Sequence, residues 1–192
     1  MMKKMTLLAM AVIMMCVLPA CANYAKKYDN NTIIIKKNGS VVEVAVEDFK
    51  DSSVREEELT SYVEEQIQSY NDANGKGAIK KKSINTDDMS KVKLVLTYKN
   101  IESFNGFNLQ ECKLDDFSNI KESELNGSYT SSEGKKVEYN DLQDIDKAKV
   151  FIVPEAADIV ISGDVLYYNE EVSVKDDIMA TTGKDNAIII YK

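Results

Sequence analysis

Short runs of β-branched residues joined by tight turns are the feature that most constrains the fold of this chain. Thr32–Lys37 and Val41–Val46 lie on either side of the dipeptide Asn38-Gly39. Asn-Gly favours a two-residue hairpin turn, because both turn positions need positive φ. Valines at alternate positions 42, 44 and 46 predict that one face of the second strand is buried. The sequence therefore predicts a β-hairpin over residues 32–46.

A second hairpin is predicted over residues 78–98. Residues 78–84 and 91–98 flank the turn-rich segment 85–88, and apolar side chains alternate at positions 92, 94, 96 and 98. An amphipathic helix is predicted between the hairpins, over about residues 54–73. Residues 53–56 (Ser-Val-Arg-Glu) match a capping box, and Asn74-Gly75 is typical of a helix end. The apolar face of this helix comprises Leu59, Tyr62, Val63, Ile67 and Tyr70.

A short helix is predicted near residues 101–107. After it, the composition changes from one segment to the next. Residues 108–146 are acidic and low in aliphatic side chains, which predicts mobility, with a short hairpin over 128–137 and one helical turn over 141–146. Strands are predicted again at 149–153, 158–161, 164–168 and 187–191. The last is an uninterrupted apolar run, which is typical of a central strand buried on both faces.

Together these elements predict an α+β fold. Its antiparallel sheet is built from hairpins, the main helix and the short second helix pack on one face, and the C-terminal strands complete it. At 192 residues, the chain has the length of one such domain with a short leader.

The N-terminus has the features of a secretory signal. Lysines at positions 3 and 4 precede an apolar stretch over residues 5–18. This stretch is shorter than the roughly 20 residues that a membrane-spanning helix needs. It ends at Leu18-Pro19-Ala20-Cys21, which resembles the lipobox of bacterial lipoproteins, with Leu18 and Ala20 in the signal-recognition positions.

The lipobox resemblance implies a diacylglyceryl group with palmitate-type chains on Cys21 and cleavage before that residue. We therefore expect residues 1–20 to be a signal peptide, 21–31 a lipidated tether and 32–192 a single domain on the extracytoplasmic face of the cell membrane. Two alternatives are a signal without lipidation, cut near Ala22, and a retained N-terminal anchor.

Composition excludes several classes of function. Without residues 1–20 the chain has 22 basic and 32 acidic side chains, a net charge of −10, so we expect no nucleic-acid partner. Histidine is absent, which excludes every Ser-His or Cys-His nucleophile pair. Cys112 is then the only thiol besides Cys21, and its acidic neighbours favour a small core residue over a reactive thiol.

Paired carboxylates are the main catalytic chemistry that the composition leaves open. Two carboxyl groups about 5–9 Å apart can hydrolyse a glycosidic bond, and carboxylates can bind Ca²⁺. However, 32 acids in one chain make adjacent pairs expected by chance, and positions 141, 144 and 146 lack the spacing of a calcium loop. We therefore predict no catalytic residue, no metal site and no cofactor. The candidate acids are Asp48, Asp51, Glu56, Glu57, Glu58, Asp87, Asp88, Asp115, Asp116, Asp176 and Asp177.

Aromatic and amide side chains supply weak candidates for ligand contact. Phe104, Asn105 and Phe107 lie in one short segment, and Tyr168 is expected on the outward side of its strand. The alternative for the first group is a helix that packs both rings into the core and ends at Asn-Gly.

Residues 32–108 resemble a group of uncharacterised lipoproteins of Clostridia-type (Firmicutes) bacteria. The similarity rests on the Asn-Gly hairpin, residues 46–49, the helix over 57–71 and the segment 104–108, and it extends to 149–153 and 164–168. The group has no assigned activity, so the resemblance implies export and lipidation only. We expect a non-catalytic binding or accessory protein of the cell envelope, with a protein or cell-wall partner. The alternatives are a carboxylate-based envelope hydrolase and an abundant structural envelope lipoprotein.

Overall fold

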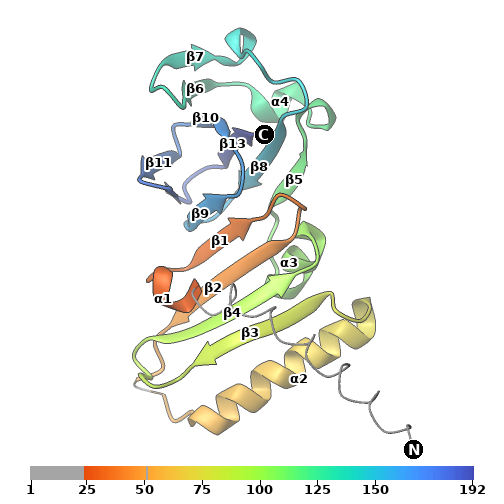
Figure 1. Cartoon of the computed structure of the whole chain (residues 1–192), viewed down its shortest axis with the longest axis vertical. Helices are drawn as coiled ribbons and strands as arrows, with labels where there is room; N and C mark the ends of the chain where they lie inside the picture. Colours follow the sequence, from red (N-terminus) through yellow and green to blue (C-terminus); the bar gives the residue numbers. More distant parts are fainter. Residues whose placement is uncertain (1–23, 51) are drawn as a thin grey trace, which may run out of the picture.

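The computed structural model describes residues 24–50 and 52–192, which form an α+β fold with two β-sheets (Figure 1). Sheet A has the strand order β11-β12-β9-β1-β2-β4-β3, and sheet B has the order β5-β8-β13-β10-β6-β7. The predicted signal peptide, with Leu18 and Ala20, and the predicted lipidation site Cys21 lie outside the described residues, as does Asp51. The elements of sheet A are β1 (Thr32–Ile35), β2 (Val41–Glu47), β3 (Ile79–Asn85), β4 (Val92–Tyr98), β9 (Asp158–Ile161), β11 (Val172–Lys175) and β12 (Ile178–Thr181). Those of sheet B are β5 (Lys113–Asp116), β6 (Ser128–Ser131), β7 (Lys136–Glu138), β8 (Lys149–Val153), β10 (Val165–Asn169) and β13 (Ala187–Tyr191). The helices are α1 (Tyr24–Lys27), α2 (Glu56–Asn74), α3 (Ile101–Asn108) and α4 (Glu122–Leu125).

Both predicted hairpins of the first half are confirmed, as β1–β2 and β3–β4. The first turn differs in detail, because three residues, 37–39, separate Lys36 from Ser40, whose backbone groups are still hydrogen-bonded at 2.9 Å. Gly39 alone in this turn has positive φ, at 79°. This geometry is typical of a three-residue hairpin loop, which also favours glycine in its left-handed position.

Three C-terminal strands extend sheet A beyond β1. β9 pairs with β1 in parallel, with Ile33 opposite Ile159, and β12 and β11 follow. The sequence did not predict β11 or β12. Along β11 only Val172 is buried, so an edge position leaves this strand without the apolar alternation that would reveal it.

Sheet B confirms the prediction for the last strand. All five residues of β13 are buried, and β13 lies between β8 and β10. Its side chains alternate between two cores, because Ile189 packs in one cluster and Ile188 and Ile190 pack in another.

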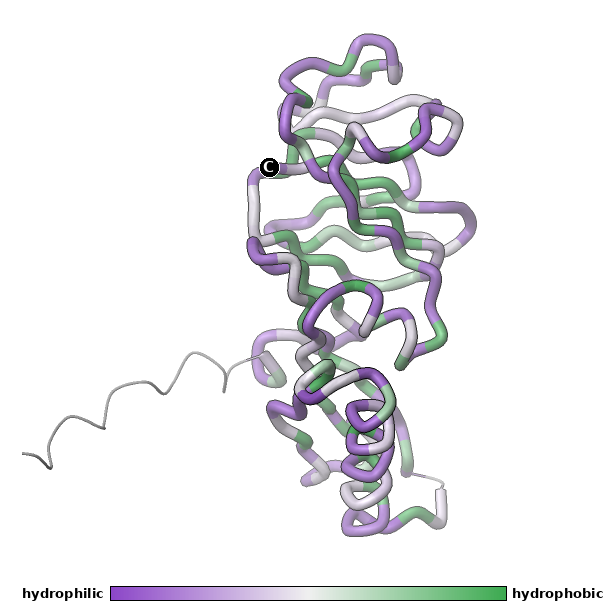
Figure 2. Tube along the Cα trace, turned by 90° about the vertical axis from the view of Figure 1, so that its right-hand side faces the viewer, coloured by the Kyte–Doolittle hydropathy of each residue, from purple (hydrophilic) through white to green (hydrophobic). Residues whose placement is uncertain are grey.

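Each sheet has apolar side chains on both faces. The inner face of sheet A, which carries Ile33, Ile35 and Val41, shares its core with Phe151 and Ile189 of sheet B. The opposite side of sheet A, called the outer face below, is defined by Ile34, Val42, Val44 and Val95 and has a smaller core of its own. The hydrophobic parts of the trace accordingly concentrate in the strands (Figure 2).

Helices α2 and α3 pack on the inner face of sheet A, on the part that sheet B does not cover. α2 lies beside β3 at one end of the molecule (Figure 1). Arg55, rather than Ser53, precedes the first turn of α2, and the Glu58 carboxylate accepts a hydrogen bond from the Arg55 N–H at 3.2 Å. Tyr62, predicted on the apolar face, is 60% exposed. α3 continues through Gly106, where a Cβ would lie 2.5 Å from the Tyr70 hydroxyl. Glycine there permits close contact between the two helices.

Residues 108–146 are folded to a greater extent than their composition predicts. They include β5, the predicted hairpin β6–β7 and α4, and they place Leu125 and Tyr129 in the second core of sheet B. The predicted helical turn at 141–146 is instead a 3-10 turn at Tyr139–Asp141. A few large side chains suffice because β8 and β13 supply the rest of that core.

The described part of the predicted tether, residues 24–31, packs against the outer face. Tyr28 is 4% exposed, and Lys93 Nζ donates to the carbonyl oxygens of Ala25 and Tyr28 at 2.8 Å each. Asn31 Oδ1 accepts from the Val46 N–H at 2.7 Å. No helix in the described ranges, 24–50 and 52–192, has the length and apolarity to cross a membrane.

Candidate functional site

A pocket of about 300 Å³ opens where sheet A, α3 and the β8–β9 connection meet. We call it the seam pocket. The residues that matter most for its chemistry are Glu43 of β2, Asn108 of α3, and Gln110, Cys112 and Glu155 of the adjoining loops. They come from segments that are far apart in sequence, so only the tertiary fold forms this site.

Glu43 is the central polar group of the pocket. It lies on β2 two residues from Val41 and opposite Ile33 of β1, so the strand alternation turns its side chain toward the inner face. There its carboxylate accepts hydrogen bonds from the Tyr98 hydroxyl and from Asn108 Nδ2, the latter at 3.2 Å. Asn108 Nδ2 also lies 3.1 Å from the Tyr98 hydroxyl oxygen. The three side chains form one hydrogen-bonded cluster at the wall of the pocket.

Burial changes the acidity of this cluster. Desolvation raises the pKa of Glu43 above its ordinary value of 4.5, and the hydrogen bonds from Tyr98 and Asn108 offset part of that effect. Desolvation and the neighbouring Glu43 charge also raise the pKa of Tyr98, so its hydroxyl remains a donor. A carboxyl group with a raised pKa beside a cavity is a recognised mark of functional sites.

The opposite wall of the pocket is held by fixed loop contacts. Glu155, whose side chain is exposed, accepts from Gln110 Nε2 at 2.7 Å. Its carbonyl oxygen accepts from the Thr181 hydroxyl at 2.5 Å, and Thr181 Oγ1 accepts from the Ala157 N–H at 2.9 Å. Gly183 approaches the same loop so closely that a Cβ would lie 2.6 Å from the Ala156 nitrogen. The position of Glu155 therefore depends on the C-terminal strands.

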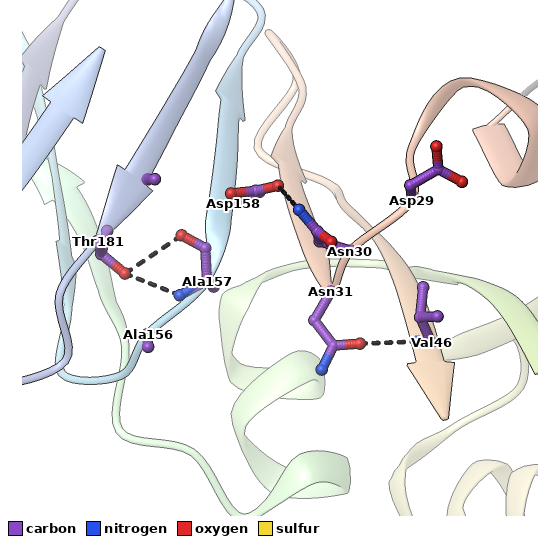
Figure 3. Close-up of a pocket in the computed structure, with 9 residues that line it drawn as sticks. Asp29, Asn30, Asn31, Val46, Ala156, Ala157, Asp158 and Thr181 are labelled. Carbon is purple, nitrogen blue, oxygen red and sulfur yellow. Dashed lines mark hydrogen bonds between the residues drawn. The ribbon is translucent and has the colours of Figure 1, made fainter. Parts of the chain in front are cut away.

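A second hollow of about 420 Å³ adjoins the first (Figure 3). The two share Asn31, Ala156 and Ala157. In the second hollow, Asn30 Nδ2 donates to Asp158 Oδ2 at 3.0 Å, so this side chain pair is already satisfied. The polar groups there serve mainly to join the N-terminal segment to β9, whereas Glu43 belongs to the seam pocket alone.

The lining of the seam pocket is acidic. It includes three carboxylates and no lysine or arginine. Its amide side chains, those of Asn31, Asn108 and Gln110, can each donate or accept a hydrogen bond. The arrangement suits a ligand that carries positive charge or several hydrogen-bond donors. The carboxylates are Glu43, Glu47 and Glu155.

The four predicted contact residues are not brought together around a ligand site. Phe104 is 2% exposed, and its ring packs edge-on against Tyr98 with centroids 5.3 Å apart. Asn105 uses its amide on the backbone of Cys112, at 2.7 and 3.1 Å. Phe107 packs against Tyr70 and Tyr98. Phe104 alone of the four borders the seam pocket, so the core-packing alternative describes this segment best.

The sequence predicts Tyr168 on the outward side of β10, but both faces of β10 pack against core clusters. Tyr168 packs against the core between the sheets, whereas Tyr167 packs in the second core. The Tyr167 hydroxyl also donates to the carbonyl oxygen of Gln143 at 3.2 Å. Tyr168 lines a separate hollow near β11 and has no contact with the seam pocket.

The predicted candidate acids do not form a metal site in the described part of the chain, and none of them lines the seam pocket. No group of three His, Cys, Asp or Glu side chains among residues 24–50 and 52–192 is placed to hold a metal ion. Several of these acids cap turns: Asp88 accepts from Ser90, and Asp115 accepts from Asn119, which lowers the pKa of both carboxyls. Cys112 is 4% exposed, and burial raises the pKa of its thiol to about 12, which confirms a core role.

Sequence reasoning missed Glu43, although a signal was present. Glu43 interrupts a run of valines at a position whose alternate neighbours, Val41 and Ala45, face the inner side. A charged residue in the middle of an apolar strand is seldom buried without partners. The partners, Tyr98 and Asn108, could not be assigned before the fold was known.

These observations define the class of protein: an α+β fold with a carboxylate-containing pocket at the seam of its two sheets. No protein-family model, no curated protein and no solved structure matches this chain.

Proposed function

We propose that this protein is a lipid-anchored, extracytoplasmic binding protein that holds its ligand in the seam pocket and has no catalytic role. The membrane address rests on the lipobox-like residues 18–21 and on the resemblance to bacterial lipoproteins. The observation that supports binding is Glu43, a mostly buried carboxyl with a raised pKa at the wall of a cavity. A carboxyl group buried in this way lowers the stability of the fold. Proteins tolerate such a loss chiefly at functional sites.

The pocket chemistry favours a ligand with an amine. An ammonium group beside Glu43 would offset the desolvation of its carboxylate and could also reach the carboxylate of Glu155. Since such a ligand needs Glu43 ionised, binding should strengthen as the pH rises through the raised pKa of Glu43. A lysine of a partner protein and an amine-bearing envelope component both meet this requirement.

The membrane address is tested by intact mass and fractionation of the protein from its own cells, beside Cys21→Ala. We expect residues 21–192 to carry a diacylglyceryl-sized mass increment and to sediment with membranes. Both properties should disappear in Cys21→Ala. A cleaved but unlipidated product in the medium would contradict the anchor, and binding would then have to be sought in a diffusible protein.

Ligand binding is tested by zero-length cross-linking in intact cells with a carbodiimide, which joins carboxylates to amines. We expect a captured partner whose cross-link maps to Glu43, Glu47 or Glu155 and is lost in Glu43→Gln. Glu65→Gln is the matched control, because it likewise removes one carboxylate but does so on helix α2, outside the pocket lining. Equal capture by the wild type and by Glu43→Gln would refute binding at this site.

A carboxylate-based hydrolase is the second candidate, because Glu43 and Glu155 line the same cavity and the pKa of Glu43 is raised. Such an enzyme needs one protonated and one ionised carboxyl group. Turnover of chromogenic glycosides by the purified protein, abolished in Glu43→Gln and in Glu155→Gln, would favour this function over binding alone.

A further inference from the structure

The two sides of sheet A differ in charge. On the inner side, α2 carries six carboxylates and no lysine or arginine between Glu56 and Asn74. Arg55 pairs with Glu58 and Lys81 pairs with Glu64, so four of the six have no ion pair among the described residues, and they leave this end of the molecule negative. The six are Glu56, Glu57, Glu58, Glu64, Glu65 and Asp72.

The outer face, by contrast, carries lysines. Lys80 of β3 pairs with Thr97, which pairs in turn with Val42, so Lys80 projects from the same side as Val42. Lys99 directly follows β4, and its N–H donates to the Ala78 carbonyl oxygen at 2.9 Å, so the pairing continues to this residue and places it on the same side as Thr97. Lys80 and Lys99 are exposed, and neither is in an ion pair among the described residues.

Two more lysines stand beside α1 on this face. Lys26 is an exposed residue of α1 itself. Lys36 continues the outer side of β1 beyond Ile34, and its Nζ donates to the Tyr24 hydroxyl at 2.5 Å while lying 4.9 Å from the Tyr24 ring centroid. Like Lys80 and Lys99, neither pairs with a carboxylate in the described part of the chain.

The carboxylates close to this group are already neutralised or lie at its edge. Asp29 pairs with Lys91 and Lys93 at 2.8 Å each, which lowers its pKa to about 2. Asp158 accepts a hydrogen bond from the neutral Asn30 amide and keeps its charge, but it lies at the edge of the group, on β9 opposite Thr32. Asp177 lies near Lys27 at the β11 side. Lys26, Lys36, Lys80 and Lys99 therefore form a basic patch, called the lysine patch below.

The N-terminal segment ends on the same face. Tyr24, Ala25 and Tyr28 pack against the outer core of sheet A. Only two residues separate Cys21 from Tyr24 in the sequence, so these positions are at most about 11 Å apart. A lipid on Cys21 would hold the outer face about that close to the bilayer.

We propose that the outer face of sheet A docks on an anionic phospholipid surface through the lysine patch, with the acidic α2 turned away. This orientation rests on the lipid anchor of the proposed function. A lysine near an anionic leaflet contributes about 1 kcal/mol, and the interaction decays over a Debye length of about 8 Å at physiological salt. The lysines of the patch lie inside that range when docked, whereas α2 lies on the far side of the sheet and is screened.

The test uses residues 21–192 with the Cys21 thiol coupled to a maleimide phospholipid, so it does not depend on processing in cells. The coupled protein is placed on vesicles of phosphatidylcholine, with or without phosphatidylglycerol. Acetylation of each lysine by an amine-reactive reagent is followed by mass spectrometry. We expect phosphatidylglycerol to slow labelling of Lys26, Lys80, Lys99 and the adjacent exposed Lys37 about fivefold, the ratio equivalent to roughly 1 kcal/mol, and high salt to restore it. Labelling of Lys121 and Lys136 should not change.

A pair of charge-reversal variants separates the patch from net charge. Lys26→Glu/Lys80→Glu/Lys99→Glu should abolish the lipid-dependent protection of Lys37, the exposed reporter in the β1–β2 turn. The matched variant Lys121→Glu/Lys136→Glu/Lys147→Glu, with the same net charge, should keep it. Equal labelling on both kinds of vesicle, or equal loss in both variants, would overturn the docking proposal. Neither result would affect the anchor, which the mass and fractionation experiment decides.

Discussion

β13 and β2 are both interior strands of their sheets, but they differ in what they bury. β13 buries five residues with no charged side chain, and each face meets an apolar core. β2 carries Glu43 among its valines and needs Tyr98 and Asn108 to satisfy that carboxylate. The comparison teaches that sheet B is built for stability, whereas sheet A gives up stability at one position to place a polar group beside a cavity.

The largest expected effect is on the apolar strand. Ile189 is fully buried, and Ile189→Ala should lower the free energy of unfolding by about 2–5 kcal/mol, because the transfer energy is lost and a cavity remains. Urea denaturation measures this loss. Val174→Ala, at an edge position that is 47% exposed, is the control and should change stability by less than about 0.5 kcal/mol. Equal losses at both positions would contradict the interpretation that burial in β13 contributes more to stability than an edge position does.

The next effect concerns the partners of Glu43. Tyr98→Phe removes the hydroxyl that donates to the carboxylate, and should cost about 1–3 kcal/mol at neutral pH, because a buried charged acceptor loses its donor. The loss should be smaller in a Glu43→Gln background. A double-mutant cycle by urea denaturation measures the coupling. The same loss in both backgrounds would show that the Tyr98 hydroxyl acts independently of Glu43.

A smaller, pH-dependent effect is expected for Glu43 itself. Its folded pKa is raised above 4.5, so the folded state binds the proton more tightly than the unfolded state. Stability from this group is therefore greatest below pH 4.5 and falls as the pH rises through the raised pKa. Glu43→Gln removes this dependence and should be as stable as the wild type, or more so, at neutral pH while losing ligand capture. Denaturation curves across this range would contradict the interpretation if the two proteins kept a constant difference.

The smallest effect is expected at Cys112. Its thiol is buried and its pKa is raised to about 12, so almost no reactive thiolate forms near neutral pH. In a Cys21→Ala chain that begins at residue 21, a thiol-specific reagent should react at pH 8 only after denaturant is added. Rapid reaction of the native protein would show that the Cys112 side of the seam pocket opens in solution.

Local sequence was a good guide wherever neighbours along the chain decide the structure. The hairpins around Gly39 and within residues 79–98, the α2 stripe of Val63, Ile67 and Tyr70, and the central place of β13 were all predicted. The reason is that turn residues and the periods of 2 and 3.6 are properties of contiguous segments. The predicted start of α2 was wrong by only a few residues. Several capping arrangements compete there, because successive glutamates can each complete a cap.

Tertiary structure alone decided the parallel pairing of β1 with β9, the division into two sheets and the seam pocket. Ile33 meets Ile159 across 126 residues of sequence, and no local pattern specifies such a pair. The same holds for Glu43, whose burial, donors and raised pKa arise only when β2, β4 and α3 come together. By itself, the sequence determined most of the strands and the two longest helices, and it supplied the lipobox resemblance. The packing of those segments decided which of 32 acids became a polar group inside the fold, because burial depends on contacts between distant parts of the chain.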